Sequence, residues 1–225
     1  MLCFRTPLLI CSLILCAAGA AYTAGKAKIA KHEATEWCDV WMPEMTRSDL
    51  PRVLLIGDSI TRAYYKDVEQ NLKGKAYCAR IATSAAVGDP ALPRQLHTFL
   101  SETKFDVIHF NIGMHGWAYS EDDYRTYLPE VLKVIRKDAP GARLIWASTT
   151  SVRKNRTPGP SDDRIRARNE IARKYFAQQH IPIDDLYTLM TPHSDLHSDD
   201  VHFNSEGAAL QATQVAAEIV KLLSQ

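Results

Sequence analysis

Short apolar runs alternate with longer segments of mixed apolar and polar residues along most of this chain. Five runs have the length and continuous hydrophobicity of strands that are buried on both faces: residues 52–57, 76–81, 105–110, 143–147 and 181–183. Five other segments carry apolar residues at helical spacing: 61–72, 92–101, 121–137, 162–179 and 205–223. Because consecutive parallel strands need a crossover connection, this alternation predicts an α/β fold, a three-layer α/β/α sandwich with a central parallel sheet.

Two of the predicted helices have recognisable starts. Ser120 precedes the acidic residues 121–123, and Ser161 precedes the acidic residues 162–163. A serine hydroxyl accepts a backbone N–H of the first turn, and acidic residues there interact favourably with the helix dipole. We therefore expect both serines to cap their helices.

The first twenty residues follow a different pattern. Arg5 is a short basic start, residues 6–16 are apolar, and residues 18–20 (Ala-Gly-Ala) offer a small-residue cleavage site. This is typical of a secretory signal peptide, and the apolar stretch is shorter than the roughly 20 residues of a spanning helix. We predict that residues 1–20 are removed and that the protein is secreted or periplasmic. A membrane anchor, or a lipid anchor on Cys16, stays open.

The remaining chain is interpreted as an irregular lead-in, residues 21–50, and one domain, residues 51–225. The lead-in carries no candidate chemistry. The 225 residues have a net charge of +1, with 46% hydrophobic and 24% charged residues. Such a balance gives no field that would gather nucleic acid or an anionic membrane, so we expect neither as a partner.

Export changes the interpretation of the cysteines. Three of the five lie in the first twenty residues, and only Cys38 and Cys78 would remain. Two cysteines in an oxidising compartment can form a disulfide. Two separate buried thiols are the alternative, and the sequence does not decide between them.

Candidate reactive groups lie where predicted strands end, which is where ligands bind in open α/β sheets. Ser59 follows the first strand, and His202 directly precedes the last helix with Asp199 three residues before it. A serine hydroxyl needs a base to accept its proton and a third group to hold that base in the correct tautomer. We predict that Ser59 is a nucleophile, His202 its base and Asp199 the partner of the base, although some 140 positions separate the first two.

A developing oxyanion would also need hydrogen-bond donors. The backbone N–H groups of Ser59 and Gly88 are candidates, together with a side chain from the turn after the third strand. Glycine at position 88 allows close approach to a reacting carbonyl and an unusual backbone conformation.

These motifs carry a resemblance to a known family. Gly57-Asp58-Ser59, Gly88, the turn at 113–115 and Asp199-x-x-His202 resemble the four ordered blocks of the SGNH (GDSL-type) hydrolases, over roughly residues 52–224. The resemblance implies a flavodoxin-like fold and ester hydrolysis without a cofactor. It also implies that Ser59 is the nucleophile, His202 the base and Asp199 its partner, with Ser59 and Gly88 as oxyanion donors.

The third block departs from the family pattern. It usually reads Gly-x-Asn-Asp, with the Asn side chain donating to the oxyanion, whereas His115 and Gly116 stand here. A neutral imidazole offers one N–H, so we expect His115 to replace that donor. Simple packing of His115 beside the pocket is the alternative, and Asn111 is a fallback donor.

Other residues near the predicted strand ends are candidates for contact with a substrate: Asp58, Asn111, Met114, Trp117 and Arg153. Arg153 begins a basic loop that could meet a substrate carboxylate, such as a uronic acid, or could simply be solvated. His193, His197 and His202 match no metal-binding spacing, and we expect no metal there.

The sequence thus predicts a secreted serine esterase that acts on small acyl esters, with O-acetyl groups on a carbohydrate as a candidate substrate. The partner would be a small-molecule or polysaccharide ester. A lipid acylhydrolase or thioesterase is one alternative, and a non-catalytic carbohydrate-binding protein that retains the fold is another.

Overall fold

The protein is built on one six-stranded sheet, seen in a computed structural model that describes residues 30–225. The strand order is β1-β3-β2-β4-β5-β6, and only β1 is antiparallel to its neighbour. The strands are β1 (Cys38–Trp41), β2 (Arg52–Gly57), β3 (Tyr77–Thr83), β4 (Val107–Phe110), β5 (Arg143–Ala147) and β6 (Ile183–Asp184). Four of the five predicted strands are confirmed, and the fifth, predicted at 181–183, forms at Ile183–Asp184. The strand β1 corrects the prediction of a wholly irregular lead-in. β1 is a four-residue, partly exposed edge strand, too short to show a pattern in the sequence.

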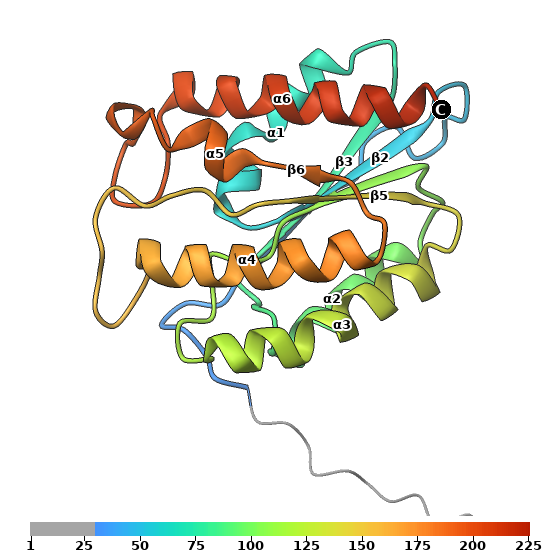
Figure 1. Cartoon of the computed structure of the whole chain (residues 1–225). Coiled ribbons are helices and arrows are strands. Elements are labelled where there is room, and N and C mark those ends of the chain that lie inside the picture. The colour runs from blue at the N-terminus through green and yellow to red at the C-terminus, as the bar shows by residue number, and fades with distance from the viewer. Residues whose placement is uncertain (1–29) are drawn as a thin grey trace, which may run out of the picture.

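Helices cover both faces of the sheet (Figure 1). One layer holds α1 (Ser59–Asn71) and α6 (Ser205–Leu223), and the other holds α2 (Ala91–Leu100), α3 (Glu121–Asp138) and α4 (Asp162–Gln178). These five helices confirm the predicted three-layer sandwich. The chain also forms α5 (Leu186–Met190) and a 3₁₀ turn, Ser194–Leu196, which are too short to be predicted from periodicity.

Strand β2 illustrates why its sequence is continuously apolar. Leu54 and Ile56 belong to the core beneath α2, α3 and α4, while Val53 and Leu55 belong to the core beneath α1 and α6. All four are fully buried. A central parallel strand contacts a helical layer on each face, so both sets of alternating side chains must be hydrophobic.

The two predicted caps have different outcomes. Ser120 and Asp123 form a capping box at the start of α3, as expected. Ser161 makes no capping hydrogen bond at the start of α4. There the N–H of Asp162 donates to the side-chain oxygen of Asn155 at 2.9 Å, so a loop residue satisfies one N–H of this first turn instead.

The two cysteines of the described residues are free thiols, which excludes the disulfide. Cys38 lies opposite Thr83, whereas Cys78 is five residues earlier on the same strand, β3. At about 3.3 Å per residue this separation is roughly 16 Å, well beyond the reach of a disulfide. Burial raises the pKa of the Cys78 thiol above its ordinary range.

A polar cluster is buried in the core between β4, β6 and α6. His109 Nε2 lies 2.8 Å from Asp184 Oδ2, with both side chains fully buried, and Gln214 donates to Asp184 Oδ1 at 2.7 Å. These hydrogen bonds tie β4 to β6 and α6 inside the core.

We expect Asp184→Ala to lower the free energy of unfolding by about 3–5 kcal/mol, because it strips a buried imidazole and a partly buried amide of their acceptor. Urea unfolding followed by circular dichroism measures the change. Asp67→Ala, at an exposed position of α1, is the matched control. A loss below about 1 kcal/mol for Asp184→Ala would contradict a supporting role for the cluster.

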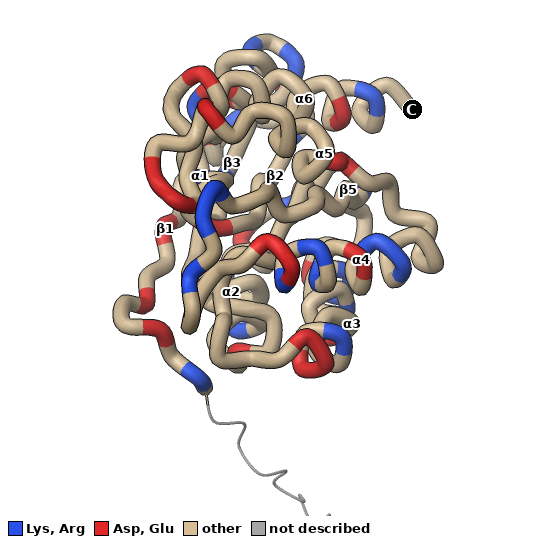
Figure 2. Tube along the Cα trace, turned by 60° about the vertical axis from the view of Figure 1, so that its left-hand side comes forward, with Lys and Arg blue, Asp and Glu red and all other residues tan. Residues whose placement is uncertain are grey.

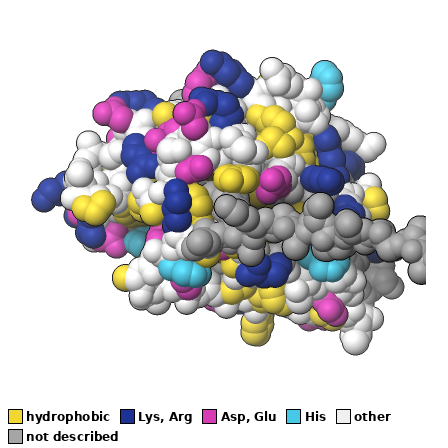
Figure 3. Space-filling model, turned by 90° about the horizontal axis from the view of Figure 1, so that it is seen from below, with side chains coloured by type: hydrophobic (Ala, Val, Ile, Leu, Met, Phe, Trp, Pro, Cys, Tyr) yellow, Lys and Arg dark blue, Asp and Glu magenta, His cyan; other side chains and the backbone are white. Residues whose placement is uncertain are grey.

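Acidic and basic residues alternate along the chain around the edge where the parallel strands end (Figure 2). Their side chains are also interspersed on the surface on the side of α2 and α3 (Figure 3). Within residues 30–225, no helix has the length and hydrophobicity needed to cross a bilayer. The predicted signal peptide, residues 1–20, lies outside the described residues.

Candidate active site

The candidate site lies beyond the carboxyl ends of β2 and β4, the two central strands. The chain passes from β2 to β3 on one side of the sheet and from β4 to β5 on the other, so strand order reverses between β2 and β4. Such a switch point leaves a crevice outside the strand ends, where ligands bind in doubly wound sheets. In Figure 1 this edge is on the left, where α3, α4 and α6 begin.

Ser59, His202 and Asp199 meet at this edge. Ser59 Oγ lies 2.7 Å from His202 Nε2, although 143 positions separate the two residues. His202 Nδ1 lies 2.8 Å from Asp199 Oδ2. The predicted proximity is therefore confirmed: a hydroxyl, an imidazole and a carboxylate form one continuous chain of hydrogen bonds, the geometry of a nucleophile with an oriented base.

The carboxylate of Asp199 also shapes the loop that carries His202. Its Oδ1 accepts the backbone N–H groups of Val201 and His202, each at 2.7 Å. Partial burial acts to raise the pKa of Asp199, but these two bonds and the His202 side chain outweigh it and hold that pKa well below its ordinary value. The carboxylate is consequently ionised at neutral pH and acts only as an acceptor for the imidazole.

The N–H groups of the two predicted backbone donors, Ser59 and Gly88, have no acceptor among the described residues. Asp58 caps α1 by accepting the N–H of Ile60 at 2.9 Å, which leaves the N–H of Ser59, the first helical residue, without an acceptor among the described residues. The N–H of Gly88 likewise has no acceptor in that part of the chain. Gly88 has φ +105°, so the predicted unusual backbone conformation is confirmed, and a Cβ there would also meet the Tyr119 ring at 3.0 Å.

His115 is oriented by a residue of the lead-in. Its Nδ1 lies 2.9 Å from Glu33 Oε2, while Glu33 Oε1 accepts the N–H of Gly116 at 2.7 Å. His115 Nε2 is buried and has no partner among the described residues. The lead-in was predicted to carry no candidate chemistry, whereas its Glu33 contacts a candidate oxyanion donor. No motif marks Glu33, because its partner is 82 positions away.

The fallback donor Asn111 does not face the site. Its amide nitrogen donates to the carbonyl of Ala147 at 2.7 Å and lies 3.3 Å from the hydroxyl of Thr149, so its hydrogens are used between β4 and β5. The expectation that Asn111 donates to an oxyanion or to substrate is wrong for this conformation.

Two other candidates for substrate contact are also enclosed. Met114 is buried in the core beneath α1 and α6, and Asp58 is buried beneath its own helix turn. These expectations are corrected as well, because Met114 packs among core side chains and Asp58 is used to cap α1. Trp117 is partly exposed, and the guanidinium groups of Arg164 and Arg168 lie over its ring at 5.1 and 4.4 Å.

Arg153 lies close to the loop that carries Asp199 and His202 but has an internal partner. Its guanidinium is 3.7 Å from Asp200, and that of Arg156 is 2.9 Å from the same carboxylate. The two guanidinium groups and the one carboxylate leave this cluster with a net charge of +1, next to Asp199 in the chain.

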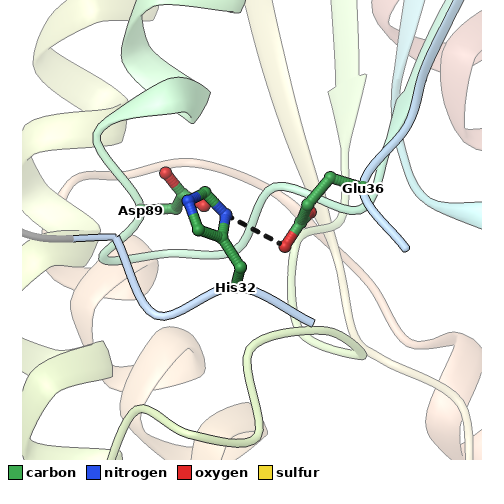
Figure 4. Close-up of side chains that lie close together, drawn as sticks. All are labelled: His32, Glu36 and Asp89. Carbon is green, nitrogen blue, oxygen red and sulfur yellow. Dashed lines mark ion pairs between the residues drawn. The ribbon is translucent and has the colours of Figure 1, made fainter. Parts of the chain in front are cut away.

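Two of the three histidines considered for a metal, His197 and His202, have separate partners. His197 lies within hydrogen-bond distance of the carbonyls of Ser194 and Ser151, and His202 belongs to the chain with Ser59. A different group, His32, Glu36 and Asp89, brings its ligand atoms within 4.8 Å of one another (Figure 4).

The dashed line in Figure 4 joins His32 and Glu36, at 3.4 Å. Glu36 Oε2 accepts from Ser84 and its Oε1 accepts from the N–H of Glu33, while Asp89 accepts from Ala91. Since both carboxylates already accept hydrogen bonds from the protein, we assign no metal to this cluster.

Comparison with known proteins is consistent with this geometry. A family model described as GDSL-like Lipase/Acylhydrolase matches residues 55–210. A carbohydrate esterase family 3 structure from Talaromyces cellulolyticus superimposes with a TM-score of 0.63 at 18% identity, covering 78% of this chain and 99% of that one.

Two other solved structures are similar. The acetyl xylan esterase AlAXEase has a TM-score of 0.59 at 17% identity, over 75% of this chain and 99% of that one. A GDSL-like lipase from Bacteroides thetaiotaomicron has a TM-score of 0.59 at 17% identity, over 76% of this chain and 88% of that one. No curated protein sequence matches this chain.

Proposed function

The chain belongs to the GDSL-like lipase/acylhydrolase family of ester hydrolases, and on that premise we propose that it is a secreted serine esterase that removes small acyl groups, with O-acetyl groups on carbohydrates as its substrate class. The observation that carries the proposal is the 2.7 Å contact between Ser59 Oγ and His202 Nε2, with Asp199 2.8 Å from the other ring nitrogen.

The reaction follows from that hydrogen-bond chain. His202 Nε2 accepts the proton of Ser59 as Oγ forms a bond to the ester carbonyl carbon, and the carbonyl electron pair moves onto oxygen. The imidazolium then returns the proton to the departing alcohol as the C–O bond breaks. Water repeats the sequence on the acyl-enzyme and releases the acid and free Ser59. Asp199 stabilises the imidazolium without taking its proton.

The oxyanion of each tetrahedral intermediate requires donors fixed in advance. We assign that role to the free N–H groups of Ser59 and Gly88, which have no competing acceptor among the described residues. The first turn of α1 adds the positive end of a helix dipole, which favours negative charge at Ser59.

The surroundings of the triad favour a small acyl group on a polar alcohol. The His202 side chain is 39% exposed and that of Asp199 is 54% exposed, so the catalytic groups open to solvent. The neighbouring loops contribute polar side chains, among them Asp200 and Arg153, and the nearby Met114 is enclosed in the core. A long acyl chain would gain little from such surroundings, because it needs apolar surface to leave water. Two of the structurally similar proteins are carbohydrate esterases, which agrees with this choice.

A panel of nitrophenyl esters tests the acyl specificity. We expect kcat/KM to be highest for acetyl and to fall at least about tenfold by octanoyl, since the polar surroundings of the triad offer a longer chain little apolar surface. Acetylated xylo-oligosaccharides test the alcohol by release of acetate. A preference for long chains would instead indicate a lipid acylhydrolase, and a preference for acyl thioesters would indicate a thioesterase.

Covalent labelling separates an enzyme from a binding protein of the same fold. A fluorophosphonate should modify Ser59 in the wild type, as located by peptide mass spectrometry. A folded protein that binds sugars but leaves Ser59 unlabelled would contradict the esterase proposal.

Secretion rests on the N-terminal sequence alone. We expect the exported protein to begin just after Ala20, which N-terminal sequencing of material from the producing cells can establish. A start at residue 1 in a membrane fraction would point to an uncleaved anchor.

A further inference from the structure

The protonation of His115 is constrained by its contact with Glu33. A carboxylate only accepts hydrogen bonds, so the Nδ1 atom 2.9 Å from Glu33 Oε2 must carry the hydrogen. A neutral imidazole has one N–H, and here that N–H donates to Glu33. Nε2 would then be a bare lone pair, unable to donate. Only the imidazolium form of His115 can donate from both nitrogens.

The free nitrogen of this ring lies on the catalytic side of the fold. His115 follows β4, which pairs with β2, the strand that leads into Ser59. Its Nε2 is buried without a partner, and its charge acts on Asp58, the residue directly before Ser59. The turn that follows, at Gly116, packs against Ala86, two residues before the proposed donor Gly88.

We propose that Glu33 is a positioning residue that keeps His115 as an imidazolium, so that His115 Nε2–H is the third donor to the oxyanion. The inference rests on the proposed serine esterase function and deepens it. It also revises the expectation of a neutral His115 donor. The family usually has an Asn amide as the donor at this position, and an amide does not titrate. An imidazolium donor loses a proton as the pH rises, so the rate should fall at alkaline pH.

The electrostatic surroundings of His115 favour the charged ring. Carboxylates face it from the lead-in, at Glu33 and Glu36, and from the start of α1, at Asp58. Arg168 of α4 donates to the carbonyl of His115 and is the opposing cation. Burial acts to lower the pKa of His115, but the hydrogen bond to Glu33 and these carboxylates together raise it above its ordinary value. The pKa of Glu33 is lowered against the effect of its burial by the same contact and by Gly116.

Glu33 is held in place by the segment around it. The N–H of Lys31 donates to the Tyr119 hydroxyl at 2.9 Å, and the N–H of Trp37 donates to Ser84 Oγ at 2.8 Å. The ring of Tyr119 also packs against Gly88, and Trp37 meets His115 edge-on at 6.1 Å. Residues 31–37 therefore join the loops of two proposed oxyanion donors, so the lead-in forms part of the site.

The Glu33→Gln variant gives the sharpest test, because it changes which nitrogen of a neutral His115 ring carries the hydrogen. The Gln oxygen can keep the N–H of Gly116, which places its amide nitrogen against His115 Nδ1. That amide donates, so Nδ1 becomes the acceptor and the neutral ring carries its hydrogen on Nε2. His115→Asn supplies an amide donor without titration. Glu102→Gln, at an exposed position, is the matched control.

The measurement is kcat/KM for nitrophenyl acetate against pH, which reports ionisations of the free enzyme. We expect the wild type and Glu102→Gln to lose activity at alkaline pH as His115 deprotonates. Glu33→Gln and His115→Asn should lack that alkaline loss and keep kcat within about tenfold of wild type at neutral pH, since a neutral donor is roughly half as strong as a charged one. His115→Ala should lower kcat by about 10² to 10³.

A spectroscopic readout is independent of turnover. Nitrogen-15 spectra of the wild type at neutral pH should show both His115 nitrogens protonated, and those of Glu33→Gln should show one. The proposal is overturned if wild-type kcat/KM holds a plateau into the alkaline range, or if the spectra show a bare Nε2 at neutral pH.

Failure of the esterase proposal would look different. In that case fluorophosphonate would label none of the variants at Ser59, whereas a wrong role for Glu33 and His115 alone would leave labelling and its rate unchanged in Glu33→Gln and His115→Ala.

Discussion

Ser59→Ala is expected to lower kcat by about 10⁶ while leaving KM within a few fold, as removal of a serine nucleophile does in a triad whose members act as a unit. The reason is local. The 2.7 Å contact between Ser59 Oγ and His202 Nε2 is where the proton leaves as the new bond to carbon forms. Alanine removes the attacking atom, and His202 and the backbone donors alone support only a residual rate of about 10³ to 10⁴ over water.

Ser205→Ala is the matched control. Ser205 is the first residue of α6, as Ser59 is the first residue of α1, and it is exposed. Both changes therefore remove a hydroxyl from the same helical position, and both should leave the unfolding free energy nearly unchanged. Steady-state hydrolysis of nitrophenyl acetate measures the rates. If Ser59→Ala kept more than about 1% of wild-type kcat, where a triad serine leaves far less, the nucleophile would be another group.

The sequence predicts the triad well because each member belongs to a local signal. Ser59 follows a continuous apolar strand within Gly-Asp-Ser, and Asp199 lies three residues before His202 at the start of a helix. The sheet topology then brings the two segments to one edge, a consequence of parallel strands having all carboxyl ends on one side. Pattern and topology together were sufficient, without knowledge of any side-chain orientation.

The predictions that depend on the orientation of a side chain were wrong for two residues. Asn111 and Met114 lie within four residues of the end of β4, as expected, but their side chains turn into the sheet edge and the core. Side-chain direction in an irregular turn has no period that a sequence could reveal. The same holds for Cys38 and Cys78, whose distance is set by strand register.

Glu33 was missed for a further reason. Its value to the site comes from contacts with His115 and Gly116, more than 80 positions away, and from an edge strand that ties the lead-in to β3. A single carboxylate in a polar segment is the commonest of surface features, so nothing in the residues nearby distinguishes it. Only the assembled structure relates it to the departure from the usual pattern at His115.

Asp199→Asn is expected to lower kcat by about 10⁴ with the fold intact, as replacement of the triad carboxylate by an amide does in serine proteases. Asp199 Oδ1 accepts the N–H groups of Val201 and His202, which would fix the oxygen of the new amide in the same place. Its NH₂ group would then face His202 Nδ1, where Oδ2 now lies at 2.8 Å. Nδ1 would become the acceptor, leaving the hydrogen of the neutral ring on Nε2, so the ring could no longer accept the proton of Ser59.

Asp200→Asn provides the comparison, because Asp200 is the adjacent carboxylate yet pairs with Arg153 and Arg156 rather than with His202. It should retain kcat within a few fold, and fluorophosphonate should label its Ser59 at the wild-type rate while labelling of Asp199→Asn slows in parallel with kcat. The low pKa of Asp199 keeps the wild-type carboxylate ionised through the mildly acidic range, so activity lost there does not come from its protonation. Should Asp199→Asn and Asp200→Asn lose activity equally, the effect would belong to the charge of the loop as a whole, and the assignment of Asp199 as the group that orients His202 would be wrong.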